Sequence, residues 1–599
     1  MSTAEQHKDA PHGWRLGFDL ARRLSRGHTR AALLLGLLML AAAFAEGLGF
    51  ALVMPLFGSI LGIEHLPGAL GEALNGLVAL VPESWRLEGL LALLAIAFAL
   101  RSLLLIGAGG LGTHFAMRLR SDWAERLYFG YLSARFPTIA GSKQGVVTHN
   151  VANETFRASR AVTIFLDFCA KLTVAAVLFA VLAFADWQAA LGITLTGGAV
   201  FYLLRRSTFR YAFSYGSKRQ KLYHQISALA AESIGAVRQI KLFGLETRSG
   251  ERMRGRLLAH ARAETRFSIF SDLPNNLLDF VLVVFVGVLL LAMIHLFAVD
   301  LKGQFHVLVT FAAVLYRLFT TLSFIIARRM KLAATLPSLL LVDDLMRHPE
   351  NREDVDAGRP LEHLDGDITF RDVAFGHGSD RPVLAALDMT LPRGRISAIV
   401  GPSGIGKSTV ADLLTGLIRP DRGEIHLGSV PLREVSLRSL RRLVGYVSQE
   451  PELFDGSIRD NILAGRPDAD DAAVAEAARL AHVSEFAANL PDGLDTIVGE
   501  RGARLSGGQR QRIAIARVIL HRPEIYIFDE ATSALDHESE RLIQDAIQRL
   551  SEMATVLLIA HRLSTIARSD RIYRLRAGGH AEAVNYADIA PANTEAASA

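Results

Sequence analysis

One apolar run near the amino terminus limits what this chain can fold into more than any other feature. It extends from Ala31 to Phe57 and contains one ionisable residue, Glu46. A helix of this length is about 40 Å long at 1.5 Å per residue, which exceeds the hydrocarbon core of a bilayer, about 30 Å thick. The run is too long for the apolar region of a signal peptide, and no small-residue cleavage pattern follows it closely. It therefore predicts a retained membrane-spanning helix.

Five more apolar segments follow in the same half of the chain. They lie at residues 87–111, 162–184, 188–204, 276–299 and 304–327. A tight turn at Asp186 separates the third span from the fourth. The expected fold of this half is a six-helix, all-α transmembrane domain at residues 31–335, preceded by a cytoplasmic amphipathic segment at residues 1–30.

The positions of the basic residues predict how the spans are oriented. The connection between spans two and three holds seven Lys or Arg residues and that between spans four and five holds fourteen, whereas the other connections have almost none. Because positive loops stay on the cytoplasmic side, both termini and the two long connections are expected there, with the loops near His65, Asp186 and Lys302 outside. The net charge of +5 comes from this asymmetry, so we expect membrane lipids rather than nucleic acid as partners.

Five ionisable side chains fall inside the apolar segments, where each costs roughly 2.5–3.5 kcal/mol unless it is paired or hydrated. They are Glu46, Arg101, Asp167, Lys171 and Arg317. Asp167 and Lys171 are four residues apart, which predicts a mutual ion pair on one helical face. Glu46 has no such local partner, and two hypotheses stand for it: a contact with cargo or a proton-linked switch, or a hydrogen bond between helices.

Beyond Lys331 the hydropathy falls, and the composition changes to that of a linker followed by a soluble domain. We expect the linker at residues 336–360, the domain at 361–585 and a tail at 586–599. Strand candidates ITFRDVAF, ISAIVG, IYIFDE and TVLLIAH alternate with helical stretches, which predicts a largely parallel α/β sheet. The single cysteine, Cys169, excludes an internal disulfide and a cysteine metal cluster.

The segment GPSGIGKST follows the strand ISAIV and precedes a helical stretch, which matches the P-loop pattern G-x-x-x-x-G-K-[ST]. Backbone amides of such a loop bind phosphates, Lys407 supplies a cation to the β- and γ-oxygens, and the Ser408 hydroxyl binds Mg²⁺. We therefore expect an α/β P-loop ATPase domain whose ligands are ATP and Mg²⁺. The predicted ATP-binding residues here are Gly401, Pro402, Ser403, Gly404, Ile405, Gly406, Lys407, Ser408 and Thr409.

The segment IYIFDE offers the two acids that such a site needs. Its apolar residues predict a buried strand that ends at Asp529 and Glu530. Asp529 is expected to hold Mg²⁺ through its second shell, while Glu530 orients and polarises the attacking water.

The segment LSGGQRQRIAIAR resembles the signature sequence of ABC transporters. Ser506, Gly507, Gly508 and Gln509 begin a helix there, and their amides form a nest for a phosphate other than the one held by the P-loop. The arrangement implies a nucleotide site shared between two subunits, because one chain carries a single set of motifs.

The resemblance covers the whole chain and implies further roles. Gln449 is expected to bind Mg²⁺ and sense the membrane domain, Asp536 to lie at the dimer seam, and His561 to contact the γ-phosphate. The segment 496–502 resembles the one that touches the intracellular helices in exporters. His377 departs from the family, because a histidine stands where a tyrosine usually stacks on adenine, and the closing segment of the domain also departs from the family pattern.

Taken together, the sequence predicts an ABC exporter half-transporter that acts as a homodimer in a bacterial cytoplasmic membrane. The resemblance implies that ATP closes two shared sites, that the stretches 151–155 and 232–237 transmit the closure, and that hydrolysis resets the transporter. AEGLGFALVMPLF in the first span resembles a pattern of lipid-linked oligosaccharide flippases, so an amphipathic, lipid-like cargo is expected. The alternatives are a multidrug or peptide exporter and, less favoured, an ATP-gated regulator or channel.

Overall fold

The computed structural model describes most of the chain in two compact units. The described residues are 29–60, 72, 74–76, 81–185, 187–295, 305–347, 352–353, 355–376, 382–531, 537–552, 554–560, 562–576 and 578–589. The first unit comprises residues 1–134 and 141–352, and the second comprises residues 135–140 and 353–599.

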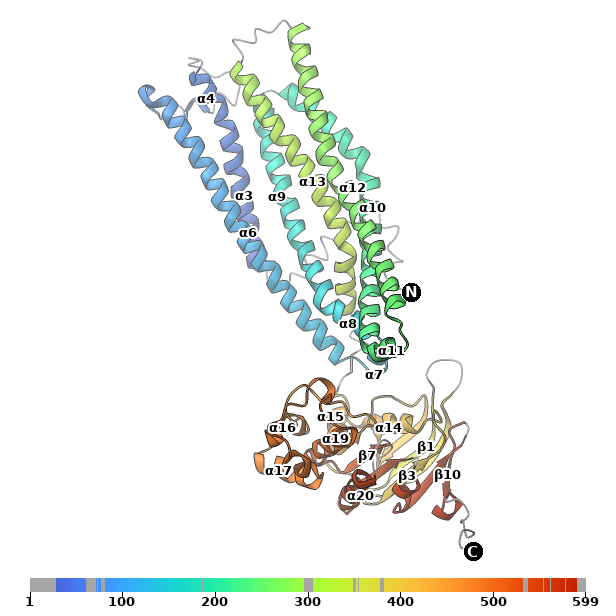
Figure 1. The fold of residues 1–599 in the computed structure, drawn as a ribbon. Coiled ribbons are helices and arrows are strands. Elements are labelled where there is room, and N and C mark those ends of the chain that lie inside the picture. Colours follow the sequence, from blue (N-terminus) through green and yellow to red (C-terminus); the bar gives the residue numbers. More distant parts are fainter. Residues whose placement is uncertain are drawn as a thin grey trace. The chain divides into compact units, whose positions relative to one another are not determined.

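Long helices, drawn in Figure 1, build the first unit. They are α3 (Thr29–Ala51), continued by α4 (Val53–Ile60), and α6 (Arg86–Leu132), α9 (Thr155–Ala185), α10 (Trp187–Gly235), α12 (Glu246–His295) and α13 (Phe305–Arg347). Most of them extend well beyond their apolar segments, so the two long connections between spans are largely helical. Among the described residues, four helical stretches are long and apolar enough to cross a membrane: Thr29–Ile60, Arg86–Leu132, Gln144–Phe184 and Glu246–Val284.

Short elements connect the long helices. They are α7 (Phe136–Ala140), α8 (Gln144–His149), the π-helix η2 (Asn150–Glu154) and α11 (Val237–Leu242). The expected stretch 151–155 lies in η2 and at the start of α9, and the stretch 232–237 joins α10 to α11. Helix α7 is the part of the connection between α6 and α9 that belongs to the second unit.

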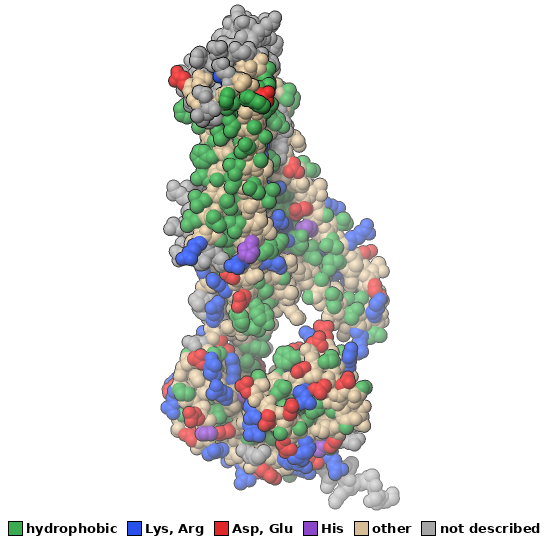
Figure 2. Space-filling view, turned by 90° about the vertical axis from the view of Figure 1, so that its left-hand side faces the viewer, with side chains coloured by type: hydrophobic (Ala, Val, Ile, Leu, Met, Phe, Trp, Pro, Cys, Tyr) green, Lys and Arg blue, Asp and Glu red, His purple; other side chains and the backbone are tan. Residues whose placement is uncertain are grey.

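The outer surface of the helical unit is apolar over much of its length. Figure 2 shows hydrophobic side chains covering the face in view, with Lys and Arg gathered toward one end of the helices. Leu33, Leu37, Leu103 and Ile106 are each more than 60% exposed. Large apolar side chains at this exposure are unfavourable in water but suit contact with lipid tails.

Glu46 is buried inside the bundle and paired with two arginines from other helices. Its carboxylate accepts a hydrogen bond of 2.9 Å from Arg101 on α6 and a second one from Arg317 on α13. The structure therefore shows the interhelical hydrogen bond that was one of the two hypotheses for this residue. The partners are far away in sequence, which is why no local spacing indicated them.

The prediction that Asp167 pairs with Lys171 was wrong about the partner. Asp167 on α9 instead forms an ion pair with Arg328 on α13, with 2.7 Å between Oδ2 and Nε. Lys171 lies 5.9 Å from the centre of the Phe324 ring. The partner of Asp167 is therefore set by packing against another helix and not by the spacing of four residues along its own helix.

Two sheets organise the second unit, and all four strand candidates from the sequence are confirmed. The antiparallel sheet has the order β2-β1-β4-β5. Its strands are β1 (Ile368–Phe375), β2 (Leu384–Leu391), β4 (Arg422–Leu427) and β5 (Val430–Pro431). The second sheet has the order β10-β9-β3-β8-β7-β6 and is parallel except for β10. Its strands are β3 (Ile396–Val400), β6 (Val444–Val447), β7 (Ile525–Asp529), β8 (Thr555–Ile559), β9 (Arg571–Leu575) and β10 (Ala581–Val584).

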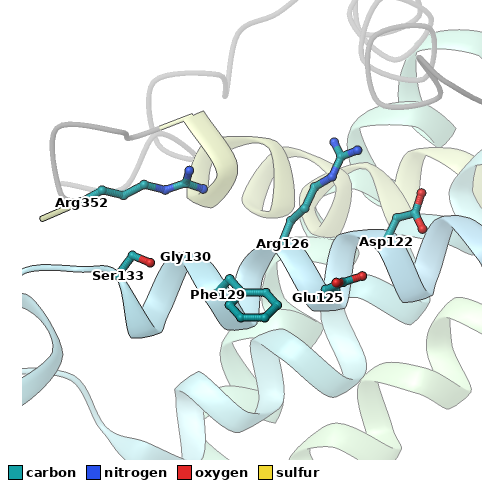
Figure 3. Close-up of a pocket in the computed structure, with 7 residues that line it drawn as sticks. All are labelled: Asp122, Glu125, Arg126, Phe129, Gly130, Ser133 and Arg352. Atoms are coloured by element: carbon teal, nitrogen blue, oxygen red, sulfur yellow. The ribbon is translucent and has the colours of Figure 1, made fainter. Parts of the chain in front are cut away.

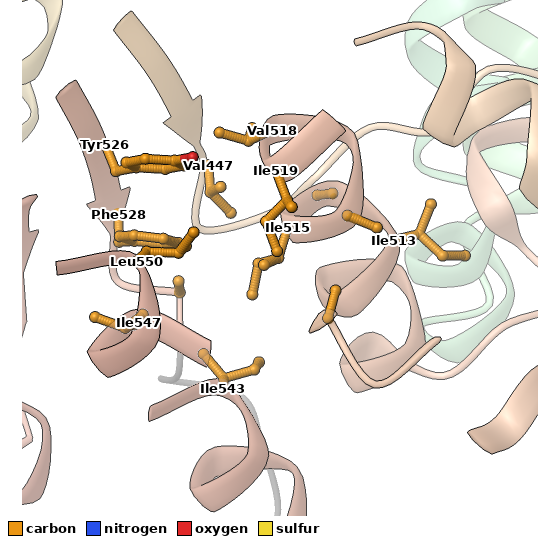
Figure 4. Close-up of a cluster of buried hydrophobic side chains, with 14 of the residues drawn as sticks. Val447, Ile513, Ile515, Val518, Ile519, Tyr526, Phe528, Ile543, Ile547 and Leu550 are labelled. Carbon is orange, nitrogen blue, oxygen red and sulfur yellow. The ribbon is translucent and has the colours of Figure 1, made fainter. Parts of the chain in front are cut away.

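Helices cover the mainly parallel sheet and form its core. They are α14 (Lys407–Leu414), α15 (Leu437–Leu443), α16 (Ile458–Leu463), α17 (Asp471–Leu480), α18 (Val483–Ala487), α19 (Gly507–His521), α20 (His537–Ser551) and α21 (Leu563–Ile566). Figure 4 shows Phe528 of β7 near Ile515 of α19 and near Ile547 and Leu550 of α20, all of them buried. Strand β7 is buried on both of its faces, which explains its continuous apolar sequence.

The linker begins later than expected. Helix α13 continues to Arg347, so residues 336–347 are helical rather than part of a linker at 336–360. A proline at position 337 is accommodated within this helix. The apolar residues of the segment explain the difference, since Leu339 and Val342 pack into a buried cluster with Trp123.

The charge cluster around Glu46 yields a prediction about stability. Glu46→Gln leaves Arg101 and Arg317 without their carboxylate, and breaking a buried ion pair costs about 3–5 kcal/mol. We expect a clearly lower melting temperature of the full-length protein in detergent. Glu88→Gln, at an exposed acid in the first turn of α6, is the matched control and should melt like the wild type. Adding Arg317→Met to Glu46→Gln should recover part of the loss, whereas an unchanged melting temperature in Glu46→Gln would contradict the role of the ion pairs.

Candidate nucleotide site

The P-loop joins a fully buried strand to an uncapped helix. Strand β3 ends at Val400, and α14 begins after Gly406, whose φ of 107° is accessible to glycine but not readily to other residues. Because the N-cap residue is this glycine, it has no side chain to cap the first amides of α14. Because these amides point out of the helix end, where the helix dipole is positive, the loop has the donors that a phosphate requires.

Lys407 places its ammonium group over this loop. The side chain is 5% exposed, and Nζ donates hydrogen bonds to the carbonyl oxygens of Gly401, at 2.9 Å, and Pro402, at 3.1 Å. Nζ is also 4.0 Å from Oε1 of Glu530. Burial lowers the pKa of Lys407, and the charges of Glu530 and Asp529 act in the opposite direction. The lysine is therefore held at the mouth of the loop, beside the acids at the end of β7.

Asp529 lies at the end of β7 and is almost completely buried. It is 5% exposed and accepts a hydrogen bond of 3.1 Å from the hydroxyl of Tyr446 on the neighbouring strand β6. Burial and the Asp529 carboxylate both raise the pKa of Tyr446, so its hydroxyl remains a donor at neutral pH. Tyr446 was not among the predicted site residues, although its position one residue before the end of a strand next to β7 could have indicated it.

Glu530 is held at the same edge of the sheet by a strained backbone. Its φ is 51°, in the left-handed region, and its N–H donates a hydrogen bond of 2.8 Å to the carbonyl of Ile559 on β8. Its Oε2 accepts a hydrogen bond of 2.8 Å from Nε2 of Gln449. The structure thus brings Lys407, Gln449 and Glu530 together from three separate segments.

A second contact supports the loop that carries Gln449. The side chain of Gln511 in α19 is buried and donates a hydrogen bond of 3.2 Å to the carbonyl of Ser448. Gln511 therefore connects the signature helix to this loop within one chain. The sequence gives no sign of this role, because a polar side chain inside an amphipathic helix carries no signal of its own.

The signature segment forms the start of α19. Ser506 caps the helix, since its hydroxyl accepts from the Gln509 amide and the Gln509 side chain accepts from the Ser506 amide. Ser506 and Gly507 are exposed, and a side chain built on Gly507 would meet no atom within 4 Å. Gly507 therefore lies open on the surface of this chain, at a helix start whose Ser506 and Gln509 amides are bonded within the cap.

The segment 496–502 is an ordered loop beside α16. The amide of Val498 donates a hydrogen bond of 2.9 Å to the carbonyl of Gly456, and Ile497 forms a bridge with Ser457. Arg501 has a φ of 52°, in the left-handed region. Ile497 is 48% exposed, so the loop keeps an apolar side chain on the surface.

Three of the predicted site residues, His377, Asp536 and His561, lie outside the described residues. The remaining residues fit ATP and Mg²⁺ by their chemistry. The loop offers uncapped amides and a lysine for phosphate, and Ser408, Gln449 and Asp529 offer oxygen atoms of the kind that Mg²⁺ prefers.

Comparisons with known proteins identify the family of the chain. Residues 384–533 match the family model for ABC transporters. An uncharacterized ABC transporter ATP-binding protein of Bacillus subtilis, YwjA, is 31% identical over 84% of this chain and 86% of its own length. The chain belongs to the ABC transporter family.

Further matches extend over the membrane half. An ATP-dependent lipid A-core flippase of Aromatoleum aromaticum is 33% identical over 81% of each chain. A solved structure of a bacterial Atm1-family ABC exporter with ATP bound superimposes with a TM-score of 0.78 at 26% identity, covering 94% of this chain and 96% of that one. The fold is therefore that of an ABC exporter, with a helical membrane region and an ATPase domain.

Two hollows in the described part of the helical unit differ in character. One, of about 430 Å³, is lined by charged side chains of α6 together with Arg352, which lies along Gly130 and Ser133 in Figure 3. The other, of about 370 Å³, lies among α3, α6, α9 and α13 and combines apolar residues such as Leu35 and Met39 with Asp167 and Arg328. We call the second one the amphipathic hollow.

The left-handed glycine before α14 yields a prediction about ATP affinity. In Gly406→Ala the new Cβ would lie 2.9 Å from Cγ1 of Val383, at a φ that costs about 1–3 kcal/mol for other residues. We expect the affinity for ATP to fall at least about tenfold, measured by titration of the full-length protein. Gly394→Ala is the matched control, because Gly394 has a φ of 66° but lies in open space before β3. If both variants lost the same affinity, general strain rather than the P-loop would be responsible.

Proposed function

We propose that this protein is an ATP-driven exporter or flippase that moves an amphipathic, lipid-like molecule across a membrane. The observation that carries the ATPase part is the position of Glu530, whose carboxylate lies 2.8 Å from Gln449 and 4.0 Å from Lys407. A carboxylate there can orient a water molecule and accept its proton while the lysine holds phosphate.

Each residue of this site then has one task. Lys407 and the amides at the start of α14 bind the phosphates, and Glu530 positions and polarises the attacking water. Ser408, Gln449 and Asp529 are the residues that would hold Mg²⁺, with Asp529 fixed by Tyr446. Bound Mg²⁺ supplies charge neutralisation of the phosphate oxygens. His377, Asp536 and His561 keep the roles that the family implies, at the adenine, the dimer seam and the γ-phosphate.

We further propose that two copies of the chain form the transporter. The exposed residues Ser506 and Gly507 and the exposed P-loop residues Ser403 and Gly404 offer two open surfaces on each chain. A homodimer can close each P-loop with the partner's signature segment, which gives two ATP sites. Six spans in each chain, one from each long helix, make twelve, with both termini on the cytoplasmic side of a bacterial inner membrane.

The amphipathic hollow supports a lipid-like cargo. Its apolar part suits acyl chains, and the charges of Arg160, Asp167 and Arg328 suit a polar headgroup. Relatives named lipid A-core flippase make a lipid-linked saccharide the favoured class. For Glu46 we propose the packing role rather than a cargo contact, because two arginines already occupy its carboxylate.

The cargo class can be tested by transport into vesicles. Purified protein in liposomes should accumulate a fluorescent lipid-linked saccharide in an ATP-dependent way, and its ATPase rate should rise with that cargo. Stimulation by drugs or peptides alone would favour a multidrug or peptide exporter instead. Dissipation of a preformed gradient would indicate a channel or regulator.

Glu530→Gln gives a direct test of the hydrolysis assignment. The amide keeps the shape of the side chain but cannot accept a proton, so ATP binding should persist while turnover falls at least about 100-fold. Glu450→Gln, at an exposed acid next to Gln449, is the control and should keep its turnover. Near-normal hydrolysis by Glu530→Gln would overturn the assignment.

The shared site can be tested with two linked copies of the chain. Lys407→Met disables a P-loop and Ser506→Arg blocks a signature segment. If each site uses the partner's signature segment, Lys407→Met in one copy and Ser506→Arg in the other leave one intact site, and about half of the ATPase rate is expected to remain. Both changes in the same copy should then abolish hydrolysis. The reverse outcome, with activity only when both changes share a copy, would show that each chain completes its own site.

A further inference from the structure

A buried cluster of metal-ligand side chains lies in the helical unit, away from the nucleotide site. It consists of His149 at the end of α8, Glu154 at the end of η2 and His224 in α10. His149 is 3% exposed and Glu154 is fully buried. One ligand atom from each residue lies within 4.8 Å of the others. No role in ATP binding or in the predicted site accounts for these residues.

The π-helix explains how His149 and Glu154 come to face each other. Five residues along an α-helix turn the chain through about 500°, so such residues point about 140° apart. A π-turn pairs residues i and i+5 instead, and such turns are frequent at functional sites. Here η2 begins directly after His149 and ends at Glu154, and Nε2 of His149 lies 3.2 Å from Oε1 of Glu154.

A glycine allows α10 to come close enough to complete the cluster. A Cβ on Gly145 in α8 would lie 2.6 Å from the carbonyl oxygen of Ser227 in α10. The close approach places Ser227 Oγ 3.3 Å from Nδ1 of His149. It also places the ring of His224 edge-on to that of His149, with centres 5.4 Å apart.

The neighbours of the cluster are those that support a metal ligand. Nδ1 of His149 lies 3.3 Å from Ser227 Oγ, which can accept its proton and fix the imidazole while Nε2 binds a metal. Glu154 is hydrogen-bonded by Gln220 and Ser338. Nε2 of His224 is buried and has no hydrogen-bond partner among the described residues, which leaves a donor or acceptor there without compensation.

Arg157 is a positively charged neighbour of the same carboxylate that a metal ion would bind. Its guanidinium lies 3.2 Å from Oε1 of Glu154 and 4.0 Å from the centre of the Tyr223 ring. The contact with the tyrosine ring is itself favourable, so the arginine can stay on the ring when Oε1 turns to another cation.

We propose that His149, Glu154 and His224 form a site for a divalent transition-metal ion of the Zn²⁺ class. Two imidazoles and one carboxylate are a donor set that Zn²⁺ uses with a fourth position open. Bonds of about 2.0–2.1 Å to a tetrahedral ion put ligand atoms about 3.4 Å apart, so the side chains must close by about an ångström. The ion would join η2 to α10 and fix the contact between these two elements.

Cobalt binding tests the site, because tetrahedral Co²⁺ absorbs visible light and competes with Zn²⁺. Tag-free, full-length protein in detergent should show a visible band on addition of Co²⁺, and one equivalent of Zn²⁺ should remove it. His224→Gln should lose this band and weaken Zn²⁺ binding at least about tenfold. In the part of the chain that the structure describes, Nε2 of His224 makes no hydrogen bond that this variant would break, so the fold is expected to survive.

Two further variants make the result decisive. His149→Gln and His224→Gln should both abolish the rise in melting temperature that Zn²⁺ gives to the wild type. His114→Gln, at an exposed histidine of α6, is the control and should behave like the wild type. No visible band, or the same band in His224→Gln, would overturn the proposal and leave a hydrogen-bonded cluster that serves packing alone.

Discussion

The nucleotide site depends on the parallel pairing of β3, β8 and β7. The register of these strands places the end of β3, which leads into the P-loop, and the end of β7, which carries Asp529 and Glu530, at one edge of the sheet. Lys407 and Glu530 are distant in sequence but 4.0 Å apart because of this pairing. The strained φ of Glu530 is held by its hydrogen bond to Ile559 on the strand between them, so the same ladder that aligns the strands also aims the carboxylate.

Much of this unit could be predicted from sequence, because its strands are short, apolar and bounded by motif residues. The runs that become β3 and β7 are buried on both faces, and their ends are marked by Gly401 and by the acids at 529 and 530. The order of the strands could not be predicted from the same pattern. Tyr446 and Gln511 were missed for that reason, since their contacts arise only when β6 lies beside β7 and α19 packs near both.

In the membrane half, composition predicted where helices form but not what their charges contact. Spacing along one helix suggested that Asp167 pairs with Lys171, yet Arg328 of α13 is the partner. Glu46 had no partner within reach of its own helix and is bound by arginines from two others. A single helical period carries no information about the neighbouring helix, and in an apolar interior a charge takes the best partner that packing supplies. The π-turn at η2 was equally absent from the sequence pattern, because nothing in NVANE departs from ordinary helical composition.

The polar contacts divide the long helices into two groups. Ion pairs join α3, α6 and α13 through Glu46, and a further pair joins α9 to α13 through Asp167. Helix α10 is connected to these helices by side-chain hydrogen bonds instead, from Gln220 to Glu154 and from Arg219 to the carbonyl of Ala334. Breaking an ion pair away from water costs more than exchanging a hydrogen bond, so among the described contacts α3, α6, α9 and α13 are held to one another more strongly than they are to α10. The cluster of His149, Glu154 and His224 lies at that boundary, where an added ligand would have the largest effect on whether the two groups can separate.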